Sequence, residues 1–234
     1  MLPLCHENRF LVEHMYVPAG GTVLDLCTGS GVLSLFAAEK ARRVIGTDIN
    51  RRAIEFASLN AQLNGVGPKI ELRLGDLFEP VGGMRFDAIL ANPPFEPTPK
   101  GWPRYLHSDG GEDGLSVTRQ IIERIPEYLE PFGSFQMVAW LSEDFVSVLD
   151  QLRRAFGAER VAVRSLFNFS MSDYIRHRMR ESNLPRGRPF LLPSKSSESV
   201  HYVYVHVVPS NSGFHRQKEV YQIGKTISAT GAVV

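Results

Sequence analysis

Several features that would place a protein in a special class are missing from this sequence. Among its 234 residues no apolar run approaches the roughly 20 residues that a membrane-spanning helix needs. The first ten residues, MLPLCHENRF, do not place an apolar segment after a basic one, so we expect no export and a cytoplasmic protein. The two cysteines, Cys5 and Cys27, form no CxxC pair. They predict reduced thiols rather than a metal site or a disulfide framework.

Strong net charge is also missing, although the charge is unevenly distributed. The chain carries +1 overall, but ten basic and four acidic residues lie from Val161 onward, and the first 160 residues carry −5. Such asymmetry indicates either different partners for the two parts or a solvated basic loop in the second. The length is suited to one domain, residues 1–234, with a decoration.

The first 160 residues alternate between two kinds of pattern. Short apolar runs predict strands at 22–27, 43–48, 70–75, 86–91 and 134–140. Helical composition predicts helices at 31–40, 51–64, 115–129 and 143–156, with Asn50 as a cap and Pro126 kinking or shortening its helix. Near-continuous apolar strands that alternate with helices predict an α/β, doubly wound, Rossmann-like fold with a parallel sheet covered on both faces.

After residue 160 the pattern changes. Two further strands, 161–169 and 200–208, bring the predicted total to seven in a mostly parallel sheet. Residues 170–199 between them are basic and rich in Pro and Ser, and we interpret them as a partly helical insert. In the C-terminal tail, 210–234, the stretch KEVYQI either pairs as an edge strand or reaches a partner chain, for example in a homodimer.

The first predicted strand ends in a Gly-rich turn, DLCTGSG, residues 25–31. Glycines let the backbone turn sharply and approach a ligand closely, and the next helix offers free N–H groups at its start. Ligands of open α/β sheets bind at the carboxyl ends of strands, so a nucleotide-like cofactor competes here with a purely structural tight turn. The third glycine of the dinucleotide fingerprint is absent, which disfavours an NAD-dependent oxidoreductase.

Acidic residues also end the next two predicted strands. Asp48 lies seventeen residues beyond Gly31, where a carboxylate can accept hydrogen bonds from two ribose hydroxyls or cap the next helix. Asp76 follows the third strand, where it either faces an adenine edge or forms a turn. Three acidic strand ends in succession favour a cofactor site.

The motifs DLCTGSG, TDIN, GDLF and NPPF, in this order, resemble those of class I S-adenosylmethionine-dependent methyltransferases over roughly residues 5–160. The resemblance implies S-adenosylmethionine as the cofactor, with Asp25 and the Thr28–Gly31 turn facing its methionine part. It also implies that Asp48 holds the ribose and that Asp76 and Leu77 lie near the adenine. Cys27 stands where many members carry glycine, and we expect its small side chain to be tolerated. The implied cofactor-binding residues are Asp25, Cys27, Thr28, Gly29, Ser30, Gly31, Asp48, Ile49, Asp76, Leu77 and Asn92.

The fourth predicted strand runs abruptly into ANPPFEPTP, residues 91–99. It is either a proline-terminated edge strand or, by the same resemblance, a site that methylates a nitrogen of a planar system. The Asn92 side-chain oxygen and the Pro93 carbonyl can each accept one N–H, which holds the nitrogen for in-line attack. Pro93 and Pro94 stiffen these acceptors, and Phe95 is predicted to stack on the planar substrate. The predicted catalytic residues are Asn92, Pro93, Pro94 and Phe95, without a metal.

Three further segments narrow the resemblance. HENRFLVEHM (6–15), GGEDGL (110–115) and LEPFGSF (129–135) are similar to motifs of protein-glutamine N5-methyltransferases, the branch that methylates the GGQ glutamine of peptide-chain release factors. Members of the branch usually carry a helical N-terminal substrate-binding domain, and we expect none in this protein.

Three methyl acceptors therefore stay open. We expect a small molecule first, with the insert 170–199 as a lid. A protein glutamine and an RNA base are the alternatives, and the basic run from Arg176 to Arg188 favours the last. His107, with Trp102 and Tyr105, either lines the substrate pocket or belongs to an exposed loop. A cofactor-binding regulatory subunit is the non-enzymatic alternative.

Overall fold

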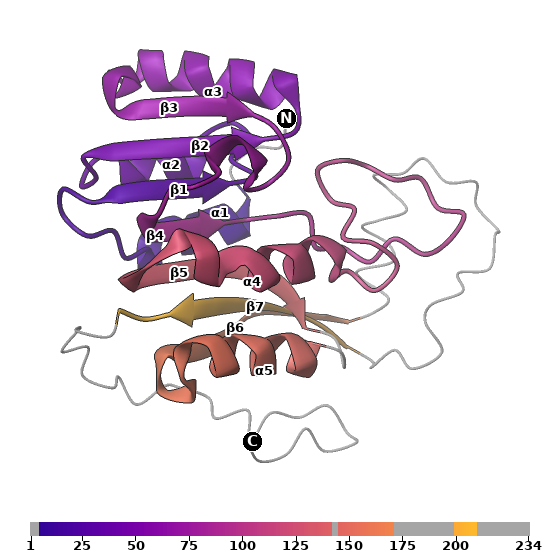
Figure 1. Cartoon of the computed structure of the whole chain (residues 1–234). Coiled ribbons are helices and arrows are strands. Elements are labelled where there is room, and N and C mark those ends of the chain that lie inside the picture. The colour runs from indigo at the N-terminus through magenta and orange to yellow at the C-terminus, as the bar shows by residue number, and fades with distance from the viewer. Residues whose placement is uncertain (1–4, 142–144, 171–198, 210–234) are drawn as a thin grey trace.

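The computed structural model describes residues 5–141, 145–170 and 199–209. Seven strands in these ranges form one sheet in the order β3-β2-β1-β4-β5-β7-β6 (Figure 1). The strands are β1 (Thr22–Leu26), β2 (Arg43–Asp48), β3 (Ile70–Leu74), β4 (Phe86–Ala91), β5 (Leu129–Leu141), β6 (Val161–Ser170) and β7 (Ser199–Val207). The first five are parallel, and β7 runs antiparallel to both β5 and β6. The predicted doubly wound, mostly parallel α/β sheet is confirmed.

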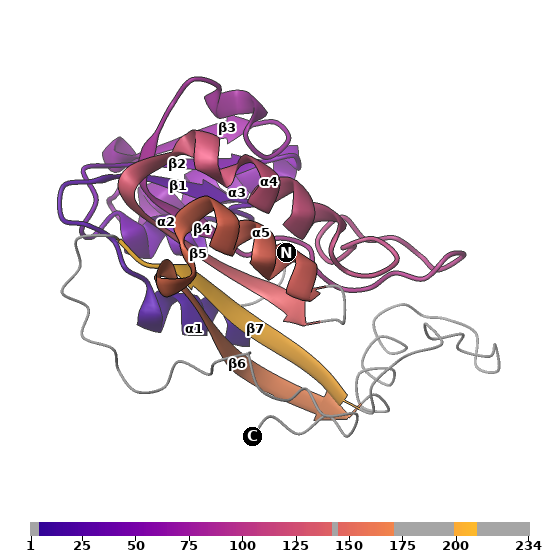
Figure 2. The same cartoon turned by 60° about the horizontal axis from the view of Figure 1, so that its bottom comes forward.

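Five α-helices within the described residues cover the two faces of this sheet. They are α1 (His6–His14), α2 (Val32–Ala37), α3 (Arg51–Leu63), α4 (Ser116–Tyr128) and α5 (Phe145–Phe156). Helices α4 and α5 lie in front of the sheet in Figure 1, and α1 and α2 lie behind it. Figure 2 shows β6 and β7 side by side along the edge of the sheet that is remote from β3.

The alternation of side chains along β1 explains how both faces are filled. Leu24 and Leu26 belong to the larger core cluster, which also contains residues of α4 and α5. Val23 points to the opposite face and packs in the cluster that contains residues of α1 and α2. Because successive strand residues point to opposite faces, Asp25 lies on the α2 side, fully buried. A carboxylate in that position needs hydrogen-bond donors from α2 or the turn before it.

Most predicted elements are present, with informative differences at their ends. Strands β2 and β4 have the predicted bounds, and the side chain of Asn50 caps α3 by accepting from Arg52 N at 3.1 Å. Helix α2 ends at Ala37, earlier than predicted, and α4 continues through Pro126 to Tyr128. Helix α1 was not predicted as a helix. The predicted insert 170–199, apart from its two end residues, and the tail 210–234 lie outside the described residues.

Two expected absences can be compared with the described residues. None of the helices described is long and apolar enough to span a membrane. The ranges described also contain no group of three or more His, Cys, Asp or Glu side chains arranged to hold a metal ion.

Candidate cofactor and acceptor site

One cavity of about 390 Å³ lies where the carboxyl ends of β1, β2 and β4 meet. Strand β1 pairs with β2 on one side and with β4 on the other. The chain therefore adds β2 and β3 on one side of β1 and β4 and β5 on the other, so the strand order reverses at β1. Open α/β sheets bind ligands in the crevice at such a switch point. The volume falls within the roughly 300–1,000 Å³ that is typical of small-molecule and cofactor sites.

The carboxylate of Asp25 ties the Gly-rich turn to the end of β1. Its Oδ2 accepts hydrogen bonds from Thr28 Oγ1 at 2.6 Å, from Ser34 N at 3.0 Å and from Ser34 Oγ at 2.7 Å. Ser34 belongs to α2, so these bonds join the strand, the turn and the following helix. The resemblance implied that Asp25 faces the cofactor, but the structure places it beneath the turn and outside the cavity lining.

Burial has a measurable consequence for Asp25. Desolvation raises the pKa of its carboxyl group to about 6, although the hydrogen bonds from Thr28 and Ser34 favour the charged form. Its other oxygen, Oδ1, has no hydrogen-bond partner among the described residues. Ionisation of Asp25 therefore costs free energy in the folded state. The hydrogen bonds from Thr28 and Ser34 hold the turn despite this cost.

The other side of the turn is fixed by α3. Asn60 Nδ2 donates to the Ser30 carbonyl at 2.8 Å. Gly31 has a φ of 85°, and a Cβ atom there would lie 3.1 Å from Ala57 Cβ. Gly31 therefore serves the contact between the turn and α3 and does not line the cavity, whereas the predicted residues Cys27 to Ser30 do.

Cys27 has a backbone conformation that favours glycine. Its φ is 56°, in the left-handed region that residues with a Cβ atom rarely occupy. We expected the small side chain of Cys27 to be tolerated; the structure accommodates it with a positive φ. The turn holds Cys27 in a strained conformation, of a kind that is concentrated at functional sites.

Asp48 connects the turn to the start of α3. Its Oδ2 accepts from Gly29 N at 2.9 Å, and its Oδ1 accepts from Asn50 N at 2.8 Å. The side chain is only half-buried and lines the cavity. Because a carboxylate oxygen can accept more than one hydrogen bond, both oxygens can still receive hydroxyl donors from a ligand. The predicted alternatives, a ligand contact and a local structural role, are thus compatible.

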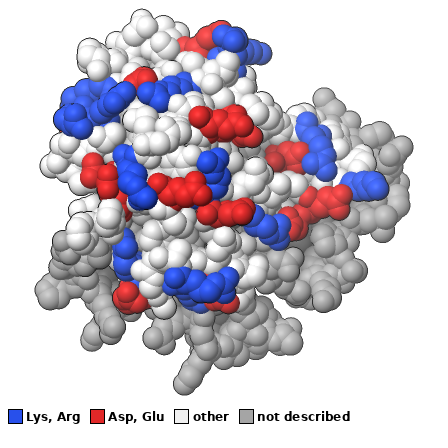
Figure 3. All heavy atoms as spheres, viewed as in Figure 1, with Lys and Arg blue, Asp and Glu red and all other residues white. Residues whose placement is uncertain are grey.

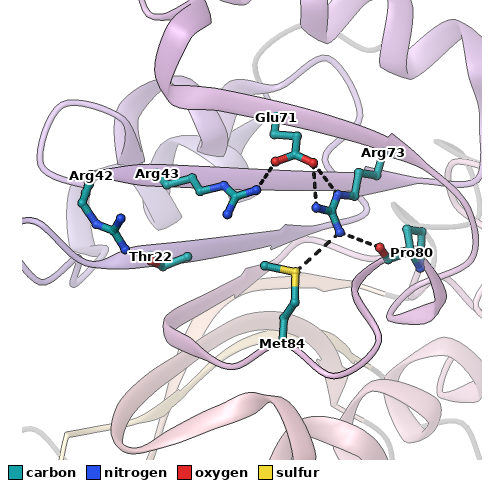
Figure 4. A network of polar contacts seen from close by, with 7 residues as sticks. All are labelled: Thr22, Arg42, Arg43, Glu71, Arg73, Pro80 and Met84. Carbon is teal, nitrogen blue, oxygen red and sulfur yellow. Dashed lines mark hydrogen bonds and ion pairs between the residues drawn. The ribbon is translucent and has the colours of Figure 1, made fainter.

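A network of polar contacts across β2 and β3 fixes the segment that follows β3 (Figure 4). Glu71 pairs with Arg43 and Arg73, and Arg73 Nη1 also donates to the Pro80 carbonyl at 2.7 Å. Exposed ion pairs contribute only about 0–1 kcal/mol each, so the effect of this network is mainly positional. Arg73 thereby holds the far end of the loop that carries Asp76 and Leu77.

Both of these loop residues line the cavity. Leu77 has a φ of 43°, a second strained residue of the site, and Thr47 Oγ1 donates to its carbonyl at 3.0 Å. The backbone at Leu77 is thus held from β2. Together with Ile49 and Phe56, Leu77 gives this end of the cavity an apolar wall suited to a flat ring.

Asn92 lines the same cavity and follows β4 directly, on the other side of β1 from β2 and β3. Its Nδ2 donates to Asn8 Oδ1 at 2.9 Å and lies 3.9 Å from Cys5 Sγ. No donor in the described parts of the chain reaches Asn92 Oδ1, so this oxygen is available to a ligand. Pro94 lines the cavity beside it, whereas Pro93 is buried and does not.

Phe95 is the predicted site residue that differs most from expectation. Its side chain is 7% exposed and packs in the core, with its ring edge-on to that of Tyr202 in β7 at 5.0 Å between centroids. Its backbone is covered by the GGEDGL segment, because a Cβ atom at Gly114 would lie 2.6 Å from the Phe95 carbonyl oxygen. In this structure Phe95 therefore anchors the loop after β4 and does not face the cavity.

Sequence reasoning missed several cavity residues. The lining residues that were not predicted are Cys5, Asn8, Val32, Leu33, Thr47, Asn50, Arg52, Ala53, Phe56 and Leu106. His107, for which a pocket position and an exposed loop were both open, lines the cavity, whereas Trp102 and Tyr105 do not. The family resemblance of HENRFLVEHM, which begins one residue after Cys5, is the signal that could have found Asn8.

Both thiols of the described residues lie at this cavity. Burial raises the pKa of the Cys5 thiol to about 11. Burial, together with the charges of Asp48, Asp25 and Asp76, raises the pKa of the Cys27 thiol as well. A protonated thiol is a poor nucleophile, so neither group competes for an electrophilic ligand at neutral pH.

These features define a class I methyltransferase domain. They are a doubly wound sheet, a Gly-rich turn with a carboxylate at the next strand end, and an Asn-Pro-Pro segment at the same cavity. The Methyltransferase small domain family matches residues 6–167, and the chain belongs to this family. The predicted resemblance is confirmed, and with it S-adenosylmethionine as the cofactor of the domain.

Two glutamine methyltransferases are similar to this chain over about half of its length. The chain is 41% identical over 138 residues to a ribosomal protein uL3 glutamine methyltransferase of Bradyrhizobium diazoefficiens, covering 54% of this chain and 42% of the relative. It is 35% identical over 141 residues to a release factor glutamine methyltransferase of Geobacter sulfurreducens, covering 55% and 49%. The aligned region thus spans less than half the length of either relative.

A solved structure supports the fold alone. Precorrin 8w decarboxylase of Methanobacterium thermoautotrophicum superposes with a TM-score of 0.53 at 20% identity, covering 84% of this chain and 87% of the other.

Proposed function

We propose that the protein transfers a methyl group from S-adenosylmethionine to the side-chain amide nitrogen of a glutamine in another protein. One observation carries the proposal. Asn92 shares a cavity with the Gly-rich turn and Asp48, and its side-chain oxygen is available to a ligand while its amide group is held by Asn8. An acceptor nitrogen bound at Asn92 would thus lie in the cavity that holds the cofactor.

The residues present fit the cofactor. Asp48 would accept hydrogen bonds from the ribose hydroxyls, Leu77 would contact the adenine, and the Thr28–Ser30 backbone would contact the methionine part. Asp25 would act indirectly, by holding the turn. When bound, S-adenosylmethionine supplies an electrophilic methyl group on a sulfonium centre.

At the acceptor end, the chain has to activate a weak nucleophile. The lone pair of an amide nitrogen is delocalised into the carbonyl group. Asn92 Oδ1 would accept one N–H bond, which favours a tetrahedral nitrogen with a localised lone pair. The Pro93 carbonyl, the second acceptor expected from the sequence, belongs to a buried residue outside the cavity lining. Asn92 Oδ1, with the amide group held by Asn8, would also orient the nitrogen toward the methyl group, and one amide proton is lost to solvent.

The relatives favour a protein glutamine over the other acceptors. Both are named as glutamine methyltransferases, of a ribosomal protein and of release factors. The expectation of a small-molecule acceptor has no comparable support, and its lid lies outside the described residues. For RNA, the face shown in Figure 3 interleaves basic and acidic side chains, and the described residues form no continuous basic band on it.

Incubation with methyl-labelled S-adenosylmethionine and three separate pools tests this choice. The pools are total cell protein, total RNA and a small-molecule extract. We expect label in protein alone. Label confined to RNA or to small molecules would overturn the glutamine proposal, and the absence of transfer to all three pools would favour the regulatory alternative.

A further inference from the structure

The carboxamide of Asn92 is held by a residue of a distant segment. Asn92 Nδ2 donates to Asn8 Oδ1 at 2.9 Å, in a partly buried contact between residues 84 positions apart. A carboxamide can rotate by half a turn and exchange its oxygen and nitrogen with little change in shape. Only the oxygen accepts an N–H, so a methyltransferase that relies on Asn92 needs one of these two orientations.

We infer that Asn8 is a positioning residue that selects the productive orientation of Asn92. Because Asn8 Oδ1 is an acceptor, it binds the Nδ2 end of Asn92 and leaves the Oδ1 end to the methyl acceptor. The inference rests on the proposed function, since the orientation matters only if Asn92 Oδ1 binds the acceptor nitrogen.

Helix α1 is docked firmly enough to perform this task. Leu11, one turn beyond Asn8, is completely buried in the core. The ring of Phe10 packs edge-on against Tyr204 of β7 at 5.3 Å between centroids. After the helix, the fully buried side chain of Gln136 accepts from Tyr16 N at 2.7 Å and donates to Tyr16 O at 2.9 Å. Contacts of Phe10 before Leu11 and of Tyr16 after it thus attach this part of the chain to the sheet.

Asn8 itself has the right exposure for the role. It is half-buried and lines the same cavity as Asn92, so its bond is partly shielded from water. Partial shielding strengthens a hydrogen bond relative to the same contact in bulk water. Cys5, at the start of the same helix turn, adds only a weak contact of 3.9 Å to Asn92 Nδ2, so Asn8 is the main partner.

Three single variants separate positioning from folding. Asn8→Ala removes the acceptor, and Asn8→Asp retains an acceptor oxygen. Arg9→Ala is the matched control, because Arg9 lies in the same helix turn and its charged group is exposed in a pair with Glu13. With the protein that takes up label as substrate, we expect Asn8→Ala to lower kcat roughly 10- to 100-fold, the scale of a misplaced catalytic group. The KM and the cofactor Kd should change little, Asn8→Asp should recover most of kcat, and Arg9→Ala should resemble the wild type.

A double variant gives the sharpest readout. In Asn92→Asp alone, only one of the two facing side chains carries a charge. In Asn8→Asp combined with Asn92→Asp, two carboxylates would face each other at hydrogen-bond distance, where both cannot remain charged without repulsion. We expect the double variant to lose far more activity than the product of the two single losses. Independent losses would show that the two side chains are not coupled and would overturn the inference.

A spectroscopic test does not depend on the substrate. The side-chain NH₂ signals of Asn92 in a ¹⁵N correlation spectrum are assigned by their loss in Asn92→Asp. Asn8→Ala should shift these signals and speed their hydrogen exchange, while Arg9→Ala should leave them in place. Unchanged signals overturn the inference, as does a shift without loss of kcat. If no protein accepts label, the proposed function fails, and the spectrum still decides whether Asn8 orients Asn92.

Discussion

The cofactor end and the acceptor end of the cavity are assembled from different kinds of contact. At the cofactor end, the hydrogen bonds join neighbouring strand–helix units. Thr28 and Ser34 donate to Asp25, and Gly29 N donates to Asp48. The longest bonds there, Thr47 to Leu77 and Asn60 to Ser30, span thirty positions. At the proposed acceptor end, Asn92 donates a hydrogen bond to Asn8, 84 positions earlier, and Phe95 packs on Tyr202 of β7. Local contacts create the first end, and long-range docking creates the second.

Substitutions at the two ends of the cavity should therefore have different effects. Changes at the cofactor end should alter binding or backbone strain. Changes at the acceptor end should alter turnover at nearly constant cofactor affinity. The predictions below test this division, beginning with the largest effect.

Asn92→Ala should reduce turnover roughly 100- to 1,000-fold, as removal of a single catalytic hydrogen-bonding group does elsewhere. The cofactor Kd, measured by calorimetry with S-adenosylhomocysteine, should stay within a few-fold of the wild type. Normal turnover would remove Asn92 from the mechanism. A large loss of cofactor affinity would contradict the division between the two ends.

Asp25→Asn should change how stability depends on pH. The folded-state pKa of about 6 exceeds the ordinary value of 3.8. Between these values the folded state binds more protons than the unfolded state, so the contribution of Asp25 lowers the unfolding free energy as pH rises from about 4 to 6. The total is about 3 kcal/mol at 1.36 kcal/mol per pKa unit.

We expect this decline to be absent from Asp25→Asn in denaturant titrations without cofactor. Groups with a lowered pKa, such as Glu71 and Asp113, affect both proteins equally and cancel in the difference. If the unfolding free energy changed with pH in the same way in both proteins, this would contradict a raised pKa of the buried Asp25 carboxyl group.

Asp48→Ala should weaken cofactor binding by about 1.5–3 kcal/mol, the value of a hydrogen bond to a charged group. It should also loosen the turn, because Gly29 N loses its acceptor. Thermal melts with S-adenosylhomocysteine should show a smaller shift than the wild type, and Asn92→Ala is the comparison that should keep the full shift. An unchanged shift in Asp48→Ala would exclude its contact with the ribose.

Cys27→Gly should stabilise the fold modestly, by roughly 0.5–1 kcal/mol, because glycine adopts a positive φ without a steric cost. Cys27→Ala is the control: it removes the thiol but keeps the Cβ atom, so it should bring no gain. Denaturant midpoints of the three proteins check this expectation. Equal stability of Cys27→Gly and Cys27→Ala would show that the φ of Cys27 stores no strain.

The same division explains what could be predicted from the sequence. The strand ends at Asp25, Asp48 and Asp76 follow from local patterns, because each motif belongs to one strand and the turn after it. The roles of Asp25 and Phe95 could not be read in this way. Burial of Asp25 depends on α2 packing over it, and burial of Phe95 depends on a strand more than one hundred positions later.

Helix α1 and its cavity residues show the same limit. The stretch HENRFLVEHM has a charged residue at nearly every second position of its first half, and only docking through Leu11 makes it a helix of the core. Arg52 and Phe56 were within reach of prediction, since they lie in the first turns of the helix that follows Asp48. Leu106 and His107 depend on the long loop between β4 and α4, whose path local patterns do not specify.

The most direct measurement of the central proposal is the position of the transferred methyl group. A protein labelled with deuterated methyl from S-adenosylmethionine is digested, and its peptides are sequenced by mass spectrometry. We predict the label on the side-chain amide of a glutamine, and its loss with Asn92→Ala. Label on another type of residue, or label that persists in Asn92→Ala, would contradict it.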